Sequence, residues 1–272
     1  MWQIEYKTPM LMGILNVTPD SFSDGGRYLD RDKAVAHALQ MQEEADIIDI
    51  GGESSRPGAE FISETEEIKR VIPVIEEIRK VSDILISIDT VKANVAQAAL
   101  DAGANWINDI SALRLDKNMI RIAQDWQCPV IIMHMQKTPK TMQQDPYYDD
   151  VVKEISDFFK ERLAFLNTEG IMKCIIDPGL GFGKRFRDNI DLLKDIRTFK
   201  DLGFPVLIGA SRKSFLGNIT GREISDRLPA TLTANFYALQ KGVDIIRVHD
   251  VAAHRDMIKF WQTIEQEEHY EY

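Results

Sequence analysis

The sequence predicts a single-domain (β/α)8 barrel, the TIM-barrel fold, spanning residues 1–272. Three observations favour this α/β class: short apolar runs recur eight times, most are followed by a segment with helical periodicity, and each ends near a turn-rich or glycine-rich loop. Strands that are buried on both faces are continuous Val, Ile and Leu runs in helix-covered parallel sheets. A doubly wound open sheet shares the alternation, but NVTPDSFSDGG at 16–26 replaces the glycine-rich nucleotide turn expected there.

Each expected strand is justified by its own apolar run. In order, the runs are MLMGILN (10–16), ADIIDIGGE (45–53), ILISIDT (84–90), NWINDIS (105–111), PVIIMHM (129–135), KCIIDPG (173–179), PVLIGAS (205–211) and VDIIRVHD (243–250). Their ends carry Asn16, Glu53, Asp89, Asn108, His134, Asp177, Ser211, and Arg247 with His249. In a closed barrel the carboxyl ends of the strands meet at one rim, so these polar residues are expected to gather there.

The segments between the runs are expected to form helices, at 30–43, 64–80, 91–102, 116–126, 148–167, 188–201, 226–241 and 251–266. Two helix starts carry typical N-terminal signals. They are the acidic residues in the first turn after Ser63, and Asp226 ahead of the seventh helix. Four connections are unusually long, at 18–29, 54–62, 136–148 and 212–225. All four follow a strand, which places them on the catalytic rim, where long loops tend to act as lids.

Composition argues against several classes of protein. The formal net charge of −10 disfavours a nucleic-acid or anionic-membrane surface, because polyanions are attracted only by a basic stripe, and Lys184–Arg187 is too short to form one. Cys128 and Cys174 lack metal-ligand or redox-pair spacing and are expected to pack in the core. No apolar run approaches about 18 residues, the length that spans a bilayer, and MWQIEYKTPM lacks a signal-peptide pattern, so a soluble cytoplasmic protein is expected.

Asp89, Asn108 and Asp177 close the third, fourth and sixth runs, so a closed barrel directs their side chains toward one central cavity. Two carboxylates and an amide form an acceptor-rich pocket suited to a flat heterocycle with several N–H donors. A general acid–base pair is the rival use of the carboxylates, although no activated nucleophile is evident nearby. An Asp at a strand end also serves as a helix cap or turn former. Each of these three, however, follows a run that offers it no other partner.

Cationic residues follow the last two runs, in Ser211-Arg212-Lys213-Ser214 and Arg247-Val248-His249-Asp250. Barrels commonly hold phosphate at these places, where Arg offers a planar fork, Lys a point charge and the following helix its amide donors. The alternative is that Arg247 and Asp250 only pair with neighbours on the rim.

The glycine-rich stretch at 179–184 lacks the spacing of a phosphate-binding P-loop. Its glycines are expected to let the backbone approach a flat ligand, with Phe182 free to stack on it. His134 alone is as consistent with a satisfied rim histidine as with a ligand contact.

Seven blocks of the chain carry a family resemblance. They are MGILNVTPDSFSDGG (12–26), IDIGGESSRPGA (48–59), SIDT (87–90), NDIS (108–111), IDPGLGFGK (176–184), GASRKSF (209–215) and RVHDV (247–251). In this order they resemble the signatures of the dihydropteroate synthases, the folate-pathway enzymes of the pterin-binding barrel family. The resemblance covers the chain from about Met12 to its last expected helix.

The resemblance implies a transferase that condenses 6-hydroxymethyl-7,8-dihydropterin diphosphate with 4-aminobenzoate, giving 7,8-dihydropteroate and diphosphate. Loss of diphosphate is expected to precede attack by the amine. The implied pterin-binding residues are Asp89, Asn108, Asp177, Phe182, Lys213 and Arg247. The diphosphate is expected to contact Asn16, Arg247 and His249, with Asn16 also helping to bind Mg²⁺. The implied 4-aminobenzoate residues are Phe22, Ser55, Arg56, Pro57, Lys213 and Ser214, and the implied catalytic residues are Asp89, Asp24, Lys213 and Arg247.

One departure from the family pattern is Ser55, where the family usually has Thr in ESTRPG. The hydroxyl is retained and the methyl is lost, which leaves sulfonamide sensitivity open while catalysis is expected to stand. The family also suggests a homodimer built from late helices such as 226–241 and 251–266.

Three other functions remain as alternatives. A pterin-barrel methyltransferase that passes a folate methyl group to a corrinoid partner shares the pterin pocket, but it needs neither the SSRPG loop nor a diphosphate site. A non-catalytic pterin-binding paralogue would lack competent residues at the implied positions, which are all present here. A lysine aldolase using Lys213 fits the barrel but gives no use to Asn16 or to the acceptor residues.

Overall fold

The computed structural model describes residues 4, 9–18, 27–54 and 61–265, and its elements alternate between strand and helix as the sequence predicts. The strands are β1 (Met10–Asn16), β2 (Ile47–Gly51), β3 (Leu85–Asp89), β4 (Trp106–Asp109), β5 (Val130–Met133), β6 (Cys174–Asp177), β7 (Leu207–Ile208) and β8 (Ile245–Val248). The helices are α1 (Arg27–Met41), α2 (Glu64–Arg79), α3 (Ala93–Asp101), α4 (Asn118–Trp126), α5 (Val151–Thr168), α6 (Phe186–Lys194), α7 (Ile196–Lys200), α8 (Ser214–Thr220), α9 (Leu228–Gln240) and α10 (Val251–Glu265), with the 3-10 turn η2 (Ile224–Asp226).

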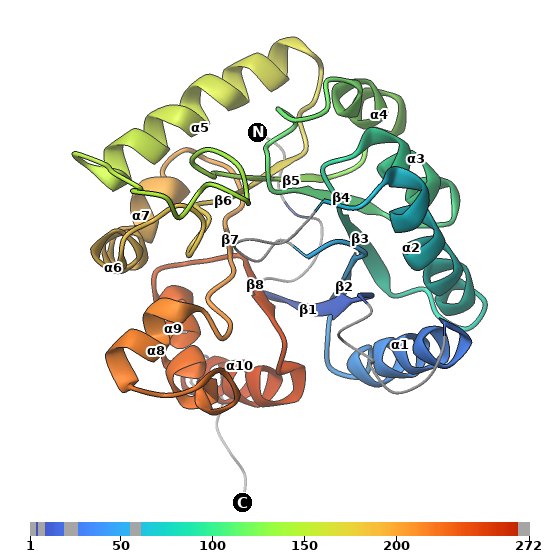
Figure 1. The fold of residues 1–272 in the computed structure, drawn as a ribbon. Helices are drawn as coiled ribbons and strands as arrows, with labels where there is room; N and C mark the ends of the chain where they lie inside the picture. The colour runs from blue at the N-terminus through green and yellow to red at the C-terminus, as the bar shows by residue number, and fades with distance from the viewer. Residues whose placement is uncertain (1–3, 5–8, 19–26, 55–60, 266–272) are drawn as a thin grey trace, which may run out of the picture.

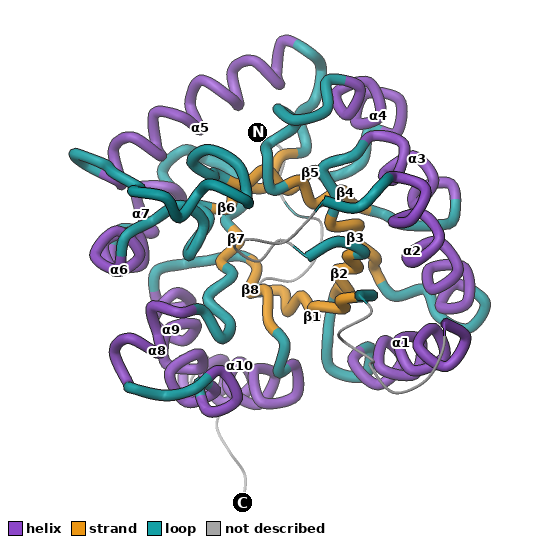
Figure 2. The backbone as a smooth tube through the Cα atoms, in the orientation of Figure 1, coloured by secondary structure: helices purple, strands orange, loops and turns teal. Residues whose placement is uncertain are grey.

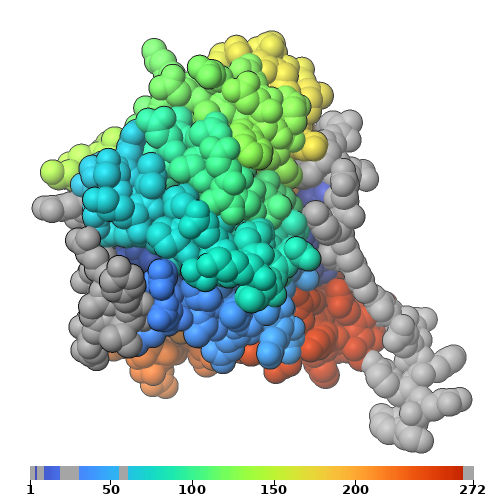
Figure 3. All heavy atoms as spheres, turned by 90° about the vertical axis from the view of Figure 1, so that its right-hand side faces the viewer, coloured from blue at the N-terminus to red at the C-terminus, as the bar shows by residue number. Residues whose placement is uncertain are grey.

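The strands form one parallel eight-stranded sheet in the order β6-β5-β4-β3-β2-β1-β8-β7. A parallel bridge between Ile176 and Val206 joins the two edges, and the Ile176 amide donates to the Pro205 carbonyl at 2.9 Å. The sheet therefore closes on itself as a (β/α)8 barrel, which confirms the predicted fold class. Figure 1 shows the helices arranged around the strands, and Figure 2 shows the same inner ring of strands in orange. From the side that faces α1–α4, their atoms cover the barrel (Figure 3).

The interior of the barrel follows from the two-residue period of a strand. One buried cluster contains Met10, Met12, Ile47, Trp106, Ile131, Ile175, Leu207 and Ile245, which fill the inside of the ring. Their neighbours in sequence, such as Ile48, Ile107 and Ile246, belong instead to the larger cluster that packs the sheet against the helices. Successive side chains point to opposite faces of a strand, so this division fixes which positions face inward.

The same alternation predicts what stands above the apolar layer. In β2, β4, β6 and β8, the residue two positions after an inner apolar residue is polar or charged. The pairs are Ile47 and Asp49, Trp106 and Asn108, Ile175 and Asp177, and Ile245 and Arg247. Asp89 has the same inward parity in β3, because Leu85 packs against the inner cluster. Polar groups thus replace hydrocarbon toward the carboxyl ends of the strands, where the barrel opens.

Two connections differ from the sequence prediction. The helix expected at 188–201 is two helices, α6 and α7, because the backbone leaves the helical region at Asp195 (φ −107°, ψ 29°). The long connection at 212–225 contains the seven-residue helix α8, which is too short for its periodicity to be recognised and ends at left-handed Gly221.

The N-terminal signals of the expected helices are partly confirmed. Ser63 accepts a hydrogen bond from the Glu66 amide at 3.2 Å and caps α2, as expected. Asp226 does not cap the seventh expected helix, because it lies in the 3-10 turn η2 and α9 begins at Leu228. Cys128 and Cys174 are buried and unpaired, in agreement with a packing role. Within the described residues, no helix is both long and apolar enough to cross a membrane.

Gly179, which follows β6, is predicted to be intolerant of a side chain. Its φ is +73°, and a Cβ would lie 2.1 Å from the His134 carbonyl oxygen. We expect Gly179→Ala to lower the free energy of unfolding by more than about 2 kcal/mol, measured by urea denaturation. Gly170→Ala is the matched control, because Gly170 also has a positive φ (+76°) but no atom within 4 Å of the added Cβ. Equal losses in the two variants would show that the close approach to His134 carries no cost.

Candidate active site

Arg247 lies at the centre of the polar layer inside the barrel. Its Nε donates to Asp49 Oδ2 at 2.6 Å and its Nη2 donates to Asp89 Oδ2 at 2.8 Å. Asp49 is fully buried, and the Arg247 side chain keeps 19% of its exposure. The arginine therefore joins β2, β3 and β8 through two ion pairs.

Asp49 is a site residue that sequence reasoning missed. Its Oδ2 also accepts from Asn108 Nδ2 at 2.9 Å, whereas its Oδ1 is buried and has no partner among the described residues. It lies inside an apolar run, whereas the sequence prediction rests on the polar residues at the ends of the runs, and Glu53 ends this one. The signal that could have found it is an inward-facing carboxylate in an otherwise apolar strand.

Glu53 itself lies beyond the end of β2 and outside the polar layer. Its Oε2 accepts from the Ile62 amide at 2.8 Å and from Lys92 Nζ at 2.7 Å. Lys92 also donates to buried Glu67 at 2.5 Å. These contacts join the two described ends of the 54–62 connection, and a small cavity of about 20 Å³ separates this cluster from Asp89.

The carboxylate of Asp89 is electrostatically unusual. Burial, opposed by the charge of Arg247 and reinforced by the nearby carboxylates of Asp49, Glu67 and Asp109, raises the pKa of Asp89 to about 7.

Asp177 and Lys213 form the opposite side of the layer. Asp177 Oδ1 accepts from the Gly179 amide at 2.7 Å, which leaves Oδ2 without a hydrogen bond from any described residue. Burial is also the main reason that the pKa of Asp177 is raised. Lys213 Nζ lies 4.1 Å from the centre of the Phe182 ring, within the range of a cation–π contact. Burial, together with the Arg247 charge, lowers the pKa of Lys213 to about 8.

The glycine-rich loop makes room for this lysine. Gly181 has φ +80°, and a Cβ at this position would lie 3.0 Å from Lys213 Cδ. The absence of a side chain at Gly181 thus lets Lys213 lie along the loop with its ammonium group over Phe182. The expected approach of this loop's backbone to a flat ligand stays a prediction.

His249 and Ser211 meet at the ends of β8 and β7. The His249 backbone amide donates to Ser211 Oγ at 3.2 Å, and the same oxygen lies 2.9 Å from His249 Nδ1. Burial and the charge of Arg247 lower the pKa of His249 to about 4, so its ring is neutral at pH 7. Asp250, by contrast, pairs with Arg212 at 2.5 and 3.0 Å. The rim-pairing alternative is therefore right for Asp250, whereas Arg247 pairs inside the barrel.

His134 is a buried structural residue. Lys184, which is also buried, donates to the carbonyls of Phe182 and His134 at 2.9 and 3.2 Å and lies 3.2 Å from His134 Nδ1. Burial lowers the pKa of Lys184 to about 7. The ring of Phe158 packs edge-on against His134. Lys184 thus joins the end of β5 to the glycine-rich loop that carries Phe182.

The remaining expected site residues divide into two groups. Asn16 ends β1 at an inward-facing position and is half-buried, and Ser214 begins α8 next to Lys213 and is exposed. Phe22, Asp24, Ser55, Arg56 and Pro57 lie outside the described residues. Within the described ranges no cluster of three or more His, Cys, Asp or Glu side chains could hold a metal ion.

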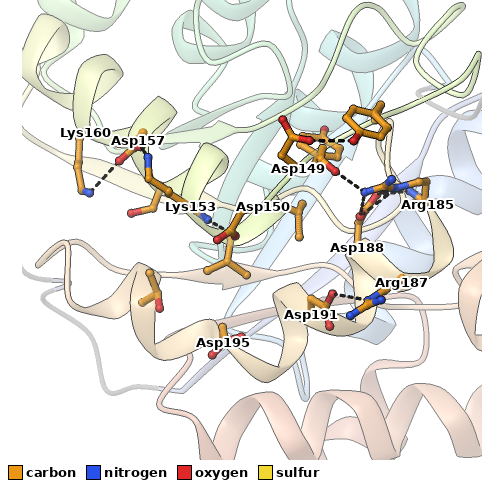
Figure 4. Close-up of a pocket in the computed structure, with 16 residues that line it drawn as sticks. Asp149, Asp150, Lys153, Asp157, Lys160, Arg185, Arg187, Asp188, Asp191 and Asp195 are labelled. Carbon is orange, nitrogen blue, oxygen red and sulfur yellow. Dashed lines mark hydrogen bonds and ion pairs between the residues drawn. The ribbon is translucent and has the colours of Figure 1, made fainter.

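A large hollow lies on the outside of the barrel, away from these residues. It has a volume of about 960 Å³, lies between α5 and α6–α7, and contains none of the expected site residues. Figure 4 shows several ion pairs among its charged side chains, such as Lys153–Asp157 at 2.6 Å and Arg185–Asp188 at 2.8 Å. This outer groove is therefore not the site in which Asp89, Asn108, Asp177, Lys213 and Arg247 come together.

Comparison with known proteins gives a consistent result. The family described as "Pterin binding enzyme" matches residues 12–249. The chain is 45% identical to dihydropteroate synthase of Haemophilus influenzae over 262 residues, covering 95% of both chains. The structure of Xanthomonas albilineans dihydropteroate synthase with 4-aminobenzoic acid has a TM-score of 0.89 at 45% identity, covering 95% of this chain and 93% of that one. The structure of the same organism's enzyme with 7,8-dihydropteroate has a TM-score of 0.86 at 44% identity, covering 95% and 94%. The chain belongs to the dihydropteroate synthase family of pterin-binding enzymes.

Proposed function

We propose that this chain condenses 6-hydroxymethyl-7,8-dihydropterin diphosphate with 4-aminobenzoate, forming 7,8-dihydropteroate and diphosphate. One observation carries the proposal: Asp89, Asn108, Asp177, Lys213 and Arg247, which come from five different strand ends, face one polar layer inside the barrel. The relatives and solved structures that match nearly the whole chain support the same transferase reaction.

The free hydrogen-bonding atoms of the layer match a pterin ring. Asn108 donates through Nδ2 and Asp177 accepts through Oδ1 within the protein, so Asn108 Oδ1 and Asp177 Oδ2 remain as acceptors for a ligand. A pterin presents a 2-amino group and ring N–H groups to such acceptors, and its 4-oxo group and N5 to donors such as Lys213 Nζ. This complementarity supports a role for these three residues, and for the Phe182 ring beside Lys213, in pterin binding.

Charge separation is the main task of the proposed catalysis. An aryl amine is a weak nucleophile, and the hydroxymethyl carbon becomes a good electrophile only as its diphosphate departs. Asp49, Asp89 and Asp177 place three carboxylates against the two cations Lys213 and Arg247. We infer that Asp89 stabilises positive charge that develops on the pterin and its methylene, because a preorganised charge in a low-dielectric site acts more strongly than in water.

The departing diphosphate is proposed to contact Arg247 and His249. The Ser211 hydroxyl accepts from the His249 amide, so its own hydrogen can be donated to Nδ1. In this arrangement the neutral ring carries its proton on Nε2 and can donate it as a hydrogen bond to a diphosphate oxygen.

Mg²⁺ is part of the same proposal. The Asn16 carboxamide faces inward and has no hydrogen bond within the described residues. Mg²⁺ is usually held by one or two protein oxygens together with substrate phosphates and water, so a single amide oxygen fits a cation held mainly by the diphosphate. When bound, Mg²⁺ supplies positive charge that offsets the charge of the diphosphate.

The 4-aminobenzoate is proposed to bind next to Lys213 and Ser214, at the start of α8. Phe22, Ser55, Arg56 and Pro57 are proposed to complete its site, with Asp24 assisting catalysis, on the resemblance of their motifs alone. These loops would exclude the water that could otherwise capture the pterin cation.

A single domain and a homodimer also remain proposals. The family match spans residues 12–249, which supports one pterin-binding domain. Apolar side chains are exposed on α8–α10 and η2, namely Ile219, Ile224, Tyr237, Phe260 and Ile264, with Phe260 69% exposed. Figure 1 shows α8, α9 and α10 on the same side of the barrel, so these helices are the proposed interface.

The corrinoid methyltransferase alternative is less well supported. A methyl transfer from folate uses no diphosphate, so it gives no role to the neutral His249 beside Arg247 or to Asn16. The relatives with near-complete coverage are dihydropteroate synthases. A non-catalytic paralogue is disfavoured because every described position in the proposed machinery carries a chemically competent residue.

The proposed reaction can be tested directly with the purified protein. Purified protein incubated with Mg²⁺, the pterin diphosphate and 4-aminobenzoate is expected to release dihydropteroate and diphosphate in equal amounts, measured by chromatography and a diphosphate assay. A reaction with 4-aminobenzoate omitted is the control. Absence of dihydropteroate from a folded sample would remove the proposed function.

Arg247 is predicted to discriminate between phosphorylated and unphosphorylated ligands. We expect Arg247→Ala to weaken binding of the pterin diphosphate at least about 30-fold more than binding of 6-hydroxymethylpterin, measured by calorimetry, because a charged partner of the diphosphate is lost. Melting temperatures are measured in parallel, since the change leaves Asp49 buried without its cation. A uniform loss for both ligands would indicate a structural role.

The pH dependence should report Asp89. Its stabilising charge exists only above its pKa, which is about 7, so kcat/KM for the pterin diphosphate is expected to fall as the pH drops through about 7. Lys213, whose pKa is about 8, should give a second decline on the alkaline side.

Asp89→Asn is expected to lower kcat far more than pterin affinity and to remove the acid limb, which is the fall of kcat/KM as the pH drops through about 7. An unchanged kcat, or an acid limb that persists in this variant, would contradict the assigned role.

A further inference from the structure

We propose that Asp49 is a positioning residue for the reaction, which fixes Arg247 and Asn108 in the orientations from which they contact the substrate. This inference rests on the proposed function, but it concerns a residue that none of the substrate-contact assignments includes. One carboxylate oxygen, Oδ2, accepts from Arg247 Nε at 2.6 Å and from Asn108 Nδ2 at 2.9 Å. Its partners are 198 and 59 residues away in the sequence, so Asp49 connects groups from β8 and β4 that nothing local aligns.

The contacts of Asp49 are all directed at the site. Its side chain is fully buried in β2 and faces the inside of the barrel, and within the part of the chain that the structure describes it forms no hydrogen bond to a helix or a loop. A buried charge is costly unless it is paired, and replacing a buried ion pair with apolar residues is often neutral for stability. Such a carboxylate is therefore better explained by the orientation of its two partners than by the stability of the barrel.

Asp49 also determines how Arg247 meets Asp89. The arginine uses Nε for Asp49 and Nη2 for Asp89, so each carboxylate receives one hydrogen bond. Without the charge of Asp49, the planar guanidinium is free to turn and form a bidentate pair with Asp89. That pairing would occupy both Asp89 oxygens and cancel the negative charge that the developing pterin cation needs. By holding Nε, Asp49 leaves Asp89 with one oxygen and part of its charge for the substrate.

The test is Asp49→Asn, which keeps the shape of the side chain but removes its charge. The carboxamide oxygen can take the place of Oδ2 and still accept from Arg247 and Asn108, but without the negative charge, and its NH₂ group would lie at the buried position of Oδ1, which has no partner among the described residues. We expect kcat/KM for the pterin diphosphate to fall on the order of 100-fold, as for other small misplacements of catalytic groups. The dissociation constant of 6-hydroxymethylpterin, measured by calorimetry, should rise as well, while the melting temperature should change little.

Ser87→Ala is the matched control. Ser87 lies opposite Asp49 in the β2–β3 register, is fully buried inside the same barrel, and its hydroxyl has no partner among the described residues. Its loss is expected to leave kcat/KM and pterin binding unchanged. A loss in Ser87→Ala as large as in Asp49→Asn would show that any change in this layer disturbs the site, and would overturn the assignment.

The pH profile provides a readout that a merely structural role would not move. Asp89 is faced by Arg247, Asp49, Glu67, Asp109 and Lys213. Without the negative charge of Asp49, which raises the pKa of Asp89, and with Arg247 paired to Asp89 only, the pKa of Asp89 should fall. The decline of kcat/KM on the acid side should therefore shift to lower pH in Asp49→Asn. Unchanged activity of Asp49→Asn would overturn the proposal. So would a loss of activity that a lower melting temperature explains while the acid-side fall of kcat/KM stays at the wild-type pH. If the wild-type protein makes no dihydropteroate, the proposed function fails, and the calorimetric comparison still decides the positioning role.

Discussion

The ion pairs of Arg247 with Asp49 and Asp89 are the interaction on which the rest of the site depends. A guanidinium inside a barrel must be paired, because an isolated charge in a low-dielectric interior is strongly disfavoured. The two carboxylates that pair with it come from β2 and β3, so the ion pairs fix three strands and two acids in one geometry. Desolvation of this cluster is also what raises the pKa of Asp89 toward neutrality. One buried cluster of ion pairs thus determines both where these side chains lie and the electrostatics of the site.

The barrel supplies the conditions for this cluster. Apolar side chains fill the inner layer at Met12, Ile47, Ile175 and Ile245, and close the cavity from below. The two-residue period then places charged and amide groups one layer nearer the rim. Beyond them, the glycine-rich loop brings Phe182 beside Lys213, and Lys184 ties that loop to the end of β5. A flat ligand in the proposed site would therefore have hydrocarbon below it, acceptors at its edge and the cations Lys213 and Arg247 beside it. This arrangement suits the proposed charge-separating reaction.

Much of this arrangement could be predicted from the sequence, because the relevant signals are local. The apolar runs reveal the strands, and Asp89, Asn108, Asp177 and Arg247 stand at their ends, where a barrel opens. The parts that could not be predicted depend on partners that are distant in sequence. Asp49 lies within a run, and only the closed barrel brings it to Arg247 and Asn108.

Local signals were also insufficient to predict some side-chain contacts and two helix boundaries. The Arg212–Asp250 pair and the Lys184–His134 contact join residues 38 and 50 positions apart, which no spacing rule connects. The helix α8 is too short for a periodic pattern, and the break between α6 and α7 reflects the backbone at Asp195 rather than a Gly or Pro.

We expect these side chains to be in place before a substrate arrives. Crystal structures of the protein with and without a bound pterin test this claim most directly. We predict that Arg247 stays paired with Asp49 and Asp89 in both structures, with shifts below about 1 Å, and that the pterin ring contacts Asn108, Asp177 and Lys213. An arginine turned away from Asp49 in the free protein, or a pterin bound outside the barrel rim, would contradict it.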